Sequence, residues 1–292
     1  MKVSLGDVRL WFDVLNAGLV PEGRHMRAKP ALLALHGGPG SDHSGFKGVL
    51  DPLCDVAQIV MYDHRGNGRS DDGDPALWTV SQWTDDVHAF CEALGIERPF
   101  VLGWSFGGMI AQSFAARYPD DLAGLVLLST ATRIAWDQFG PAFERLGGEE
   151  AGKAARYLLE PTPENREEFM RICMPLYTYR RDSEYLIYSE TRPVARREVT
   201  RHFFEDEAWR MDLEPGLARI TCPTLIINGL HDPITPPECS DILEAGLVNA
   251  EVTRVTGQLS SHDLPVDEPE LFEQAVRDFL IGCSVPGEVE TR

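Results

Sequence analysis

Short apolar runs that alternate with amphipathic helical segments are the feature of this chain that most constrains its fold. The apolar runs end in turn residues and read PALLALHG, AQIVMYDHRG, PFVLGWS, LAGLVLLS and CPTLIINGLHD. The helical segments read SQWTDDVHAFCEALG, with a serine start and a glycine stop, FGGMIAQSFAARYP, and EPELFEQAVRDFLIG. Apolar runs of this kind are typical of strands buried on both faces of a parallel sheet. We therefore expect an α/β protein with a mostly parallel, doubly wound sheet.

The alternation stops between about Ile134 and Met211. Segments such as GGEEAGKAARYLLEPTPENREEFMRIC and YLIYSETRPVARREVTRHFFEDEAW carry helical periodicity there, without apolar strand runs. We interpret this stretch as a helical insertion over the sheet. The expected organisation is a core made of residues 1–133 and 212–292 and a helical cap made of residues 134–211.

The net charge limits the possible partners. Its 46 acidic and 27 basic residues give the chain a formal charge of −19, which repels phosphate backbones and anionic lipid surfaces. We expect no nucleic-acid partner and no membrane partner. The start carries Lys2 but no apolar stretch of signal-peptide length, and no apolar run reaches the ~18 residues that cross a bilayer. A cytoplasmic location is the corresponding expectation.

The cysteine pattern and the absence of other motifs argue against a metal or a cofactor. The six cysteines are scattered without a C-x-x-C pair, so a zinc site or a redox dithiol is not indicated, and reduced thiols are expected. The sequence contains no dinucleotide fingerprint and no P-loop. We expect no cofactor and no metal.

The stretch LGWSFGG places Ser105 between a strand and a helix. Gly103 lies two residues before the serine and Gly107 two residues after it, which gives G-x-S-x-G in the strand-turn-helix setting that the motif requires. The sharp turn crowds its neighbours, so small residues must flank the serine, and the helix N-terminus favours negative charge forming there. We expect Ser105 to be a nucleophile.

A serine nucleophile needs a base, and the base needs a carboxylate to orient it. In a fold of this kind the acid follows a late strand and the histidine follows the last strand, in the chain order Ser, Asp, His. Among the eight histidines, His262 lies between the last strand pattern and the last helix, and Asp232 comes just after the apolar run TLIING. We expect His262 to be the base and Asp232 the acid.

Acyl transfer also requires donors for the developing oxyanion, usually two backbone N–H groups. One is expected at Phe106, the residue after the nucleophile. The other is expected in the glycine-rich loop of PALLALHGGPG, where the absence of side chains lets the backbone approach a substrate closely. Gly38 is the first choice for this donor and Gly37 the alternative.

Five motifs together resemble the α/β-hydrolase superfamily: HGGPG, YDHRGNGRS, GWSFGG, GLHDPITP and SSHD. The first two are most similar to the proline iminopeptidase branch. The resemblance covers the core, from about Val3 to Thr132 and from Asp212 to Ile281, and is weak across the insertion. It implies the α/β-hydrolase fold with a helical cap over the active site.

The resemblance also implies the site residues. The family's serine hydrolases use a nucleophile, an acid and a base that match Ser105, Asp232 and His262, with Gly38 and Phe106 as oxyanion donors. They form an acyl-enzyme, and in the iminopeptidase branch glutamates of the cap hold the free amine of the substrate.

Three functional classes follow. The first is a proline iminopeptidase-like aminopeptidase or amidase that releases a small N-terminal residue, with Glu205 and Glu207 of RHFFEDEAW as the amine-binding glutamates and Trp104 as a further substrate-binding residue. The second is a carboxylesterase or lactonase that acts on a small uncharged acyl substrate. The third, a non-enzymatic ligand receptor on the same fold, is disfavoured by a complete triad. Each class predicts a small-molecule or short-peptide partner.

Overall fold

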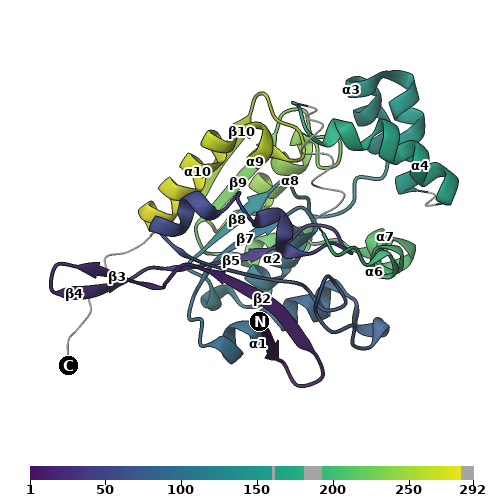
Figure 1. The fold of residues 1–292 in the computed structure, drawn as a ribbon. Coiled ribbons are helices and arrows are strands. Elements are labelled where there is room, and N and C mark those ends of the chain that lie inside the picture. Colours follow the sequence, from purple (N-terminus) through teal and green to yellow (C-terminus); the bar gives the residue numbers. More distant parts are fainter. Residues whose placement is uncertain (160–161, 181–192, 284–292) are drawn as a thin grey trace.

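The computed structural model describes residues 1–159, 162–180 and 193–283, which are built around a mostly parallel β-sheet (Figure 1). The described residues give this sheet eight strands, in the order β1-β2-β6-β5-β7-β8-β9-β10. The strands are β1 (Lys2–Ser4), β2 (Arg9–Leu15), β5 (Ala31–Leu35), β6 (Gln58–Tyr62), β7 (Phe100–Trp104), β8 (Gly124–Leu128), β9 (Thr224–Gly229) and β10 (Val252–Gly257). β1 pairs antiparallel with β2, β2 pairs antiparallel with β6, and the other pairs are parallel. The predicted α/β class is confirmed.

A separate two-stranded ribbon projects from this sheet at the left of Figure 1. It consists of β3 (Leu19–Glu22) and β4 (His25–Ala28), which pair antiparallel with each other. The ribbon lies far from the ends of the parallel strands at which the helical insertion is found.

Helices cover both faces of the sheet and one of its ends. The helices are α1 (Val80–Leu94), α2 (Phe106–Arg117), α3 (Phe139–Ala154), α4 (Pro163–Ile172), α6 (Arg197–His202), α7 (Ala208–Arg210), α8 (Pro237–Gly246), α9 (Leu264–Asp267) and α10 (Pro269–Cys283). A π-helical turn spans Phe203–Glu207, and short 3₁₀ turns span His43–Phe46, Asp51–Asp55, Pro75–Leu77, Pro119–Asp121, Ala155–Leu158, Met174–Tyr177 and Glu214–Arg219.

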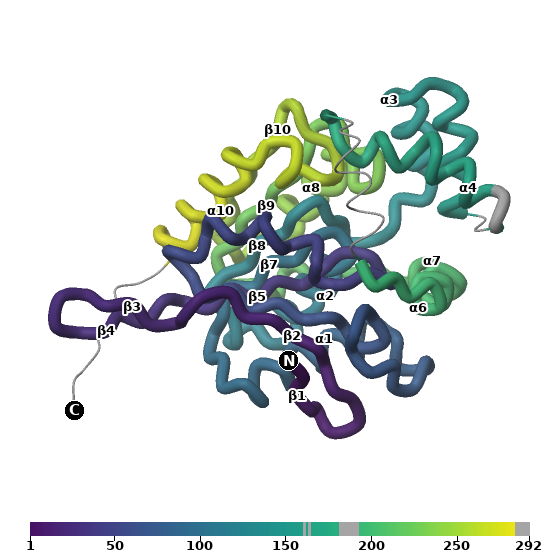
Figure 2. The backbone as a smooth tube through the Cα atoms, in the orientation of Figure 1, coloured from purple at the N-terminus to yellow at the C-terminus, as the bar shows by residue number. Residues whose placement is uncertain are grey.

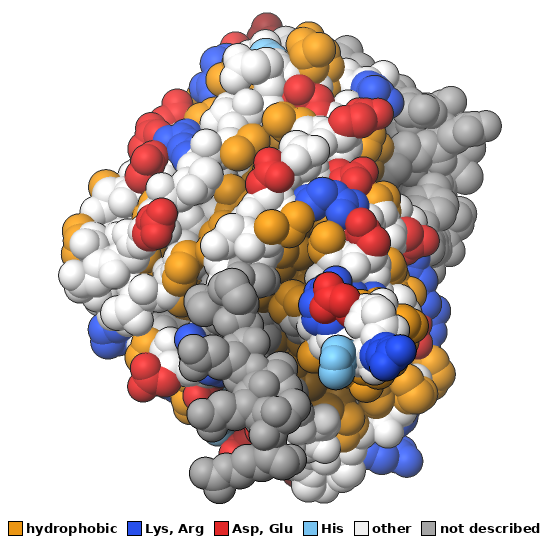
Figure 3. All heavy atoms as spheres, turned by 90° about the vertical axis from the view of Figure 1, so that its left-hand side faces the viewer, with side chains coloured by type: hydrophobic (Ala, Val, Ile, Leu, Met, Phe, Trp, Pro, Cys, Tyr) orange, Lys and Arg blue, Asp and Glu red, His pale blue; other side chains and the backbone are white. Residues whose placement is uncertain are grey.

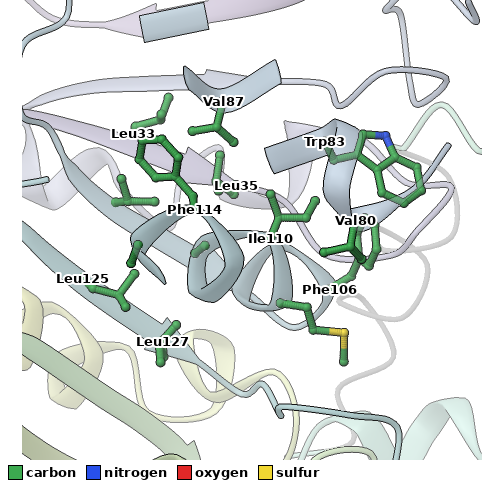
Figure 4. Packing of buried hydrophobic residues seen from close by; sticks show 14 of the residues in the cluster. Leu33, Leu35, Val80, Trp83, Val87, Phe106, Ile110, Phe114, Leu125 and Leu127 are labelled. Atoms are coloured by element: carbon green, nitrogen blue, oxygen red, sulfur yellow. The ribbon is translucent and has the colours of Figure 1, made fainter. Parts of the chain in front are cut away.

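The two faces of the sheet bury alternate residues of each strand. In β5, Leu33 and Leu35 belong to the cluster under α1, α2 and α8, whereas Leu32 and Ala34 belong to the cluster under α10. Figure 4 shows the first cluster, in which strand side chains meet the side chains of α1 and α2. Because neighbouring residues of a strand point to opposite faces, continuous apolar runs are what a sheet covered on both sides requires.

Helix α1 begins at Val80, one residue before the serine at which the sequence pattern places its start. The side chain of Thr79 caps it by accepting a hydrogen bond from the backbone N–H of Gln82 at 3.1 Å, so the predicted serine start at Ser81 is wrong. The predicted glycine stop is confirmed, since Gly95 ends the helix with φ of 63°. A residue in this left-handed conformation is most easily a glycine.

The helical region between β8 and β9 is an insertion at one end of the sheet, as predicted. Figure 2 shows α3 and α4 as one arm and α6 and α7 as another, both beyond the same ends of the parallel strands. The first arm has its own small core, which includes Phe143, Phe169 and Cys173. The domain boundaries proposed for the core and the cap remain predictions.

No described helix is both long enough and apolar enough to cross a membrane. On the face drawn in Figure 3, acidic and basic side chains are interspersed and do not form a patch of one sign. All six cysteines lie among the described residues and are free thiols.

Candidate active site

Ser105 lies at a sharp turn between β7 and α2, in a backbone conformation that a residue with a side chain rarely adopts. Its φ is 54° and its ψ is −117°. Such conformations cost roughly 1–3 kcal/mol and persist where the surrounding structure enforces them. An ordinary loop serine would relax out of this conformation.

The glycines around Ser105 are required by close backbone contacts. A Cβ atom added to Gly103 would lie 2.4 Å from the carbonyl oxygen of Gly107, and one added to Gly107 would lie 2.0 Å from the carbonyl oxygen of Leu35. A Cβ on Gly108 would meet the side chain of Thr130 at 2.5 Å. The sequence pattern around the serine therefore reflects the packing of the turn against β5 and β8.

Ser105, His262 and Asp232 form a continuous chain of hydrogen bonds. The ring nitrogen Nε2 of His262 lies 3.1 Å from Ser105 Oγ, and Nδ1 lies 2.8 Å from Asp232 Oδ2. His262 is 5% exposed and Asp232 is 3% exposed. The structure thus brings together three residues that are far apart in the sequence, in the geometry that activates a serine.

Asp232 is held by donors on both of its carboxylate oxygens. Oδ1 accepts hydrogen bonds from the backbone N–H of Ile234 at 2.7 Å and of Thr235 at 2.9 Å, and Oδ2 accepts one from the hydroxyl of Thr235 at 2.7 Å. Burial raises the pKa of Asp232, but the charge of His262 and these hydrogen bonds lower it by more. Asp232 therefore stays ionised and can stabilise a positive charge on His262.

The loop that carries His262 is attached to the insertion. The hydroxyl of Ser261 donates to the carbonyl of Leu176 at 2.6 Å, and the backbone N–H of Asp263 donates to the carbonyl of Tyr177 at 2.9 Å. The ring of Tyr177 meets the ring of His262 edge to face, with centroids 5.4 Å apart. These contacts fix the position of the imidazole relative to the insertion.

The predicted oxyanion donors belong to the residue after Ser105 and to the glycine-rich loop that packs against Ser105. Phe106 is the first residue of α2, and the N–H groups of the first helical turn have no acceptor within the helix. Gly37 lies against the serine, because a Cβ there would be 3.4 Å from Ser105 Cβ, and Gly38 follows it with φ of 132°. Both glycines remain candidates for the second donor, with Gly38 as the predicted one.

Two buried histidines support the glycine loop. His36 Nδ1 donates to the carbonyl of Gly37 at 2.7 Å, and its Nε2 accepts a hydrogen bond from the backbone N–H of His64 at 3.1 Å. Burial lowers the pKa of both imidazoles, and for His64 the shift is large. Neutral His36 therefore holds one tautomer and orients the carbonyl next to the predicted donor.

The same loop meets the insertion at Gly40. The backbone N–H of Arg196 donates to the carbonyl of Gly40 at 2.8 Å, and the hydroxyl of Thr200 donates to the carbonyl of Pro39 at 2.8 Å. A Cβ on Gly40 would lie 2.1 Å from Thr200 Oγ1. Helix α6 thus rests directly on the backbone beside the predicted oxyanion site.

A cavity of about 980 Å³ lies between the insertion and the ends of the strands, and Ser105 and His262 line it. Trp104, predicted to bind substrate, also lines it. Much of the remaining lining is apolar. These apolar residues include Met109, Phe139, Leu158, Phe169, Met170, Met174, Phe203 and Phe204.

Neither of the two glutamates predicted to bind substrate lies in this cavity. Glu205 has an exposed side chain, which does not line the cavity and pairs with Arg201 at 3.8 Å. Glu207 points to the core instead, where it accepts a hydrogen bond from the backbone N–H of Val80 at 2.8 Å at the start of α1. The glutamate that does line the cavity is Glu198 on α6, which sequence reasoning missed. A role of Glu205 and Glu207 in substrate binding therefore stays a prediction from the sequence, and neither residue lines the cavity.

Within the part of the chain that the structure describes, no group of three His, Cys, Asp or Glu side chains could hold a metal ion.

Comparisons with known proteins give a consistent family and divergent activities. The model of the alpha/beta hydrolase fold family matches residues 30–268. The chain is 28% identical to proline iminopeptidase PfmaB of Pestalotiopsis fici over 273 residues, which cover 86% of this chain and 92% of that protein. It is 29% identical to the putative carbamate hydrolase RutD of Caulobacter sp. over 272 residues, which cover 85% of this chain and 94% of that protein.

Among solved structures, a thermophilic esterase from Thermogutta terrifontis matches with a TM-score of 0.72 and 25% identity, over 98% of this chain and 99% of that chain. The relatives thus carry names of different hydrolases on one fold, so the fold alone does not assign the substrate. The family match over most of the chain, together with the strand order and the turn at Ser105, shows that this chain belongs to the α/β-hydrolase family.

Proposed function

We propose that this hydrolase is a serine hydrolase that cleaves a carboxylic ester or lactone through an acyl-enzyme on Ser105. The observation that carries the proposal is the hydrogen-bonded chain from Ser105 through His262 to Asp232 at the base of the cavity. A reaction that forms and breaks an acyl bond uses all three groups, whereas a binding protein needs none of them in this geometry.

In the first half of the reaction, His262 Nε2 takes the proton of Ser105 while Oγ attacks the carbonyl carbon of the substrate. The negative charge that develops on the carbonyl oxygen is stabilised by the N–H groups of Phe106 and Gly38, with Gly37 as the alternative to Gly38. His262 then gives the proton to the leaving oxygen, and the acyl group stays on Ser105.

In the second half, water attacks the acyl group and loses a proton to His262, and Ser105 leaves with that proton. Asp232 remains ionised throughout and stabilises the positive charge on His262 after each proton transfer. The burial of both side chains excludes water and strengthens their attraction.

The polar lining of the cavity supports an ester or lactone over a peptide. An aminopeptidase needs a carboxylate that is placed to hold the free amine of its substrate, and Glu205 and Glu207 lie outside the cavity. Glu198, Asp42 and Asp263 do line the cavity, but Glu198 has Arg196 at 3.8 Å and Asp42 is bonded to Arg69, and an ammonium group that enters the cavity without pairing with a carboxylate loses its hydration at a cost. An uncharged acyl group has no such cost.

An aminopeptidase or amidase that releases a small N-terminal residue is the second candidate, and Glu198 is the observation that favours it. Glu198 lines the cavity and has a half-exposed side chain, although Arg196 lies 3.8 Å from it. The relative from Pestalotiopsis fici, which the match covers over 92% of its length, is named a proline iminopeptidase, and this also favours the second candidate. Trp104 is proposed to contact the substrate in both cases.

Four substrates of similar size separate these candidates: a short acyl ester, a lactone, an alanyl or prolyl anilide, and the N-acetyl form of that anilide. We expect the ester or the lactone to have the highest kcat/KM and N-acetylation to have little effect. If the free anilide is the best substrate, and Glu198→Gln abolishes its advantage while Glu205→Gln does not, the aminopeptidase is correct. If the protein binds the compounds without hydrolysing any of them, the non-enzymatic receptor replaces both.

A further inference from the structure

The cavity carries more positive charge than the rest of the chain leads one to expect. Acidic residues outnumber basic ones by 46 to 27 in the whole chain, yet four arginines line the cavity. Arg133 follows β8, Arg166 lies on α4, and Arg197 and Arg201 lie on α6. The arginines therefore reach the cavity from three separate parts of the chain.

Three of these arginines form no ion pair within the described ranges. Arg201 is paired with Glu205 at 3.8 Å, whereas Arg133, Arg166 and Arg197 form no ion pair with any described carboxylate. An arginine is always charged and presents five N–H donors. These three guanidinium groups retain the capacity to bind an anion.

Two of the three acidic side chains in the lining, Asp42 and Glu198, have positive partners that do not line the cavity. Asp42 is buried and accepts a hydrogen bond from Arg69 at 2.7 Å. Although burial raises the pKa of Asp42, hydrogen bonds from Ser44, Val194 and Arg69 lower it to about 2. The carboxylate is therefore ionised, and its charge is balanced by a residue outside the cavity lining.

Two further acidic side chains line the cavity. Glu198 lies 3.8 Å from Arg196, which does not line the cavity, and Asp263 favours the charged form of its neighbour His262. Neither neutralises Arg133, Arg166 or Arg197 by an ion pair. Arg133, Arg166 and Arg197 are therefore basic side chains of the lining for which no carboxylate partner is found among the described residues.

We propose that the natural substrate is an acyl compound with an apolar body and a carboxylate remote from the bond that is cleaved, and that Arg133, Arg166 and Arg197 attract and hold this carboxylate. The inference rests on the proposed function, since it names the substrate class of the same site. Guanidinium groups match the planar geometry of a carboxylate, and the phenylalanines and methionines of the cavity accommodate the apolar body. An ammonium group at the same place meets like charge.

Two 4-nitrophenyl esters of equal chain length test the proposal: the neutral hexanoate and the monoester of adipate, which ends in a carboxylate. Ser105→Ala gives the background rate for each ester. We expect the wild-type kcat/KM for the adipate monoester to exceed that for the hexanoate by at least about tenfold, because two or more charge-assisted hydrogen bonds form. Raising the ionic strength should reduce this preference.

Variants of the three arginines test whether the preference for the adipate monoester arises from the cavity. Each of Arg133→Gln, Arg166→Gln and Arg197→Gln is expected to reduce the adipate-to-hexanoate ratio by roughly threefold to tenfold, and the triple variant is expected to bring it to one or below. The ratio is independent of the fraction of folded enzyme. Arg171→Gln is the matched control, since Arg171 lies on the same helix as Arg166 but pairs with Glu150 outside the cavity.

The outcomes distinguish the two proposals. If neither ester is hydrolysed faster than by Ser105→Ala, the proposed function fails. If both esters are hydrolysed but the wild type has no preference for the adipate monoester, or the preference survives in the triple variant, the carboxylate inference fails and the proposed function stands. Thermal unfolding of Ser105→Ala with added adipate measures binding without turnover; a rise in Tm that the triple variant abolishes supports the inference, and no rise contradicts it.

Discussion

Replacing Asp232 by asparagine tests how the carboxylate acts on His262. The backbone N–H groups of Ile234 and Thr235 both donate to Oδ1, so the oxygen of an asparagine side chain must remain there. The NH₂ group then takes the place of Oδ2, where it faces His262 Nδ1. Two donors cannot share one hydrogen bond, so His262 must move its proton to Nε2.

In that tautomer, Nε2 can no longer accept the proton of Ser105. We expect Asp232→Asn to lower kcat by about 10³–10⁴, as the loss of the correct tautomer does in serine hydrolases of this type. The fold is expected to persist, because the two backbone hydrogen bonds and the volume of the side chain are retained. The assay is kcat/KM on a neutral ester, with far-UV circular dichroism and Tm as measures of folding.

The pH profile gives an independent readout of the same change. Burial lowers the pKa of His262, but the charge and the hydrogen bond of Asp232 raise it by more, with a further contribution from Asp263, so that it lies above 6.5. Since the base must be neutral, wild-type kcat/KM should fall as the pH decreases through that raised value. In Asp232→Asn, burial acts without the carboxylate, and the residual activity should fall only at a lower pH.

Asp263→Asn is the matched control for the tautomer argument. It removes a nearby negative charge but leaves Nδ1 bonded to Asp232, so we expect a small downward movement of the pH limb and activity within about tenfold of wild type. The reasoning is refuted if Asp232→Asn keeps more than about a tenth of wild-type kcat/KM. If kcat/KM of Asp232→Asn falls at the same pH as kcat/KM of the wild type, the proposed effect of the Asp232 charge on the pKa of His262 is refuted.

Three further predictions concern the nucleophile, its turn and the attachment of the insertion. Ser105→Ala should reduce hydrolysis by several powers of ten without changing Tm by more than a few degrees, and activity above about a hundredth of wild type excludes Ser105 as the nucleophile. Gly107→Ala should lower the free energy of unfolding, measured in urea, by about 3 kcal/mol or more, because its Cβ would meet the backbone of Leu35. Gly282 has open space around it, so Gly282→Ala should be neutral or slightly stabilising, and equal effects of the two substitutions would contradict the packing argument. Burial raises the pKa of Glu207 above its ordinary value of 4.5, so its contribution to stability is greatest below that value and is lost as the pH rises through the raised one. The Tm of Glu207→Gln relative to wild type should therefore increase from pH 4 to pH 7, whereas that of the exposed Glu205→Gln should not, and parallel curves for Glu207→Gln and wild type would refute this prediction.

The turn around Ser105 could be predicted from the sequence because its constraints are local. The strand before the serine, the serine itself and the helix after it occupy residues 100–117, and the glycines are required by contacts at that same turn. The sheet could be predicted for a similar reason, since burial on both faces gives each strand a recognisable apolar run. Order along the chain then pointed to Asp232 and His262, which the structure places together with Ser105.

The substrate side of the site could not be predicted in the same way. Glu205 and Glu207 lie in a π-helical turn, Phe203–Glu207, in which the ordinary helical period does not tell which side chains share a face. The partner of Glu207 is the N–H of Val80, 127 residues earlier in the chain. No local pattern encodes a contact of that range, and the same is true of the arginines that line the cavity.

The insertion does more than cover the cavity, because it is bonded to both loops that serve Ser105. On one side, Thr200 and Arg196 bind the carbonyls of the glycine-rich loop next to the predicted oxyanion donor. On the other side, the backbone N–H of Asp263, directly after His262, donates to the carbonyl of Tyr177. A ligand that moves the insertion must therefore also move the catalytic groups. Residues of the insertion that contact the substrate are thus coupled, through these hydrogen bonds, to the residues that carry out acyl transfer. Changes in the insertion are expected to alter kcat and KM together.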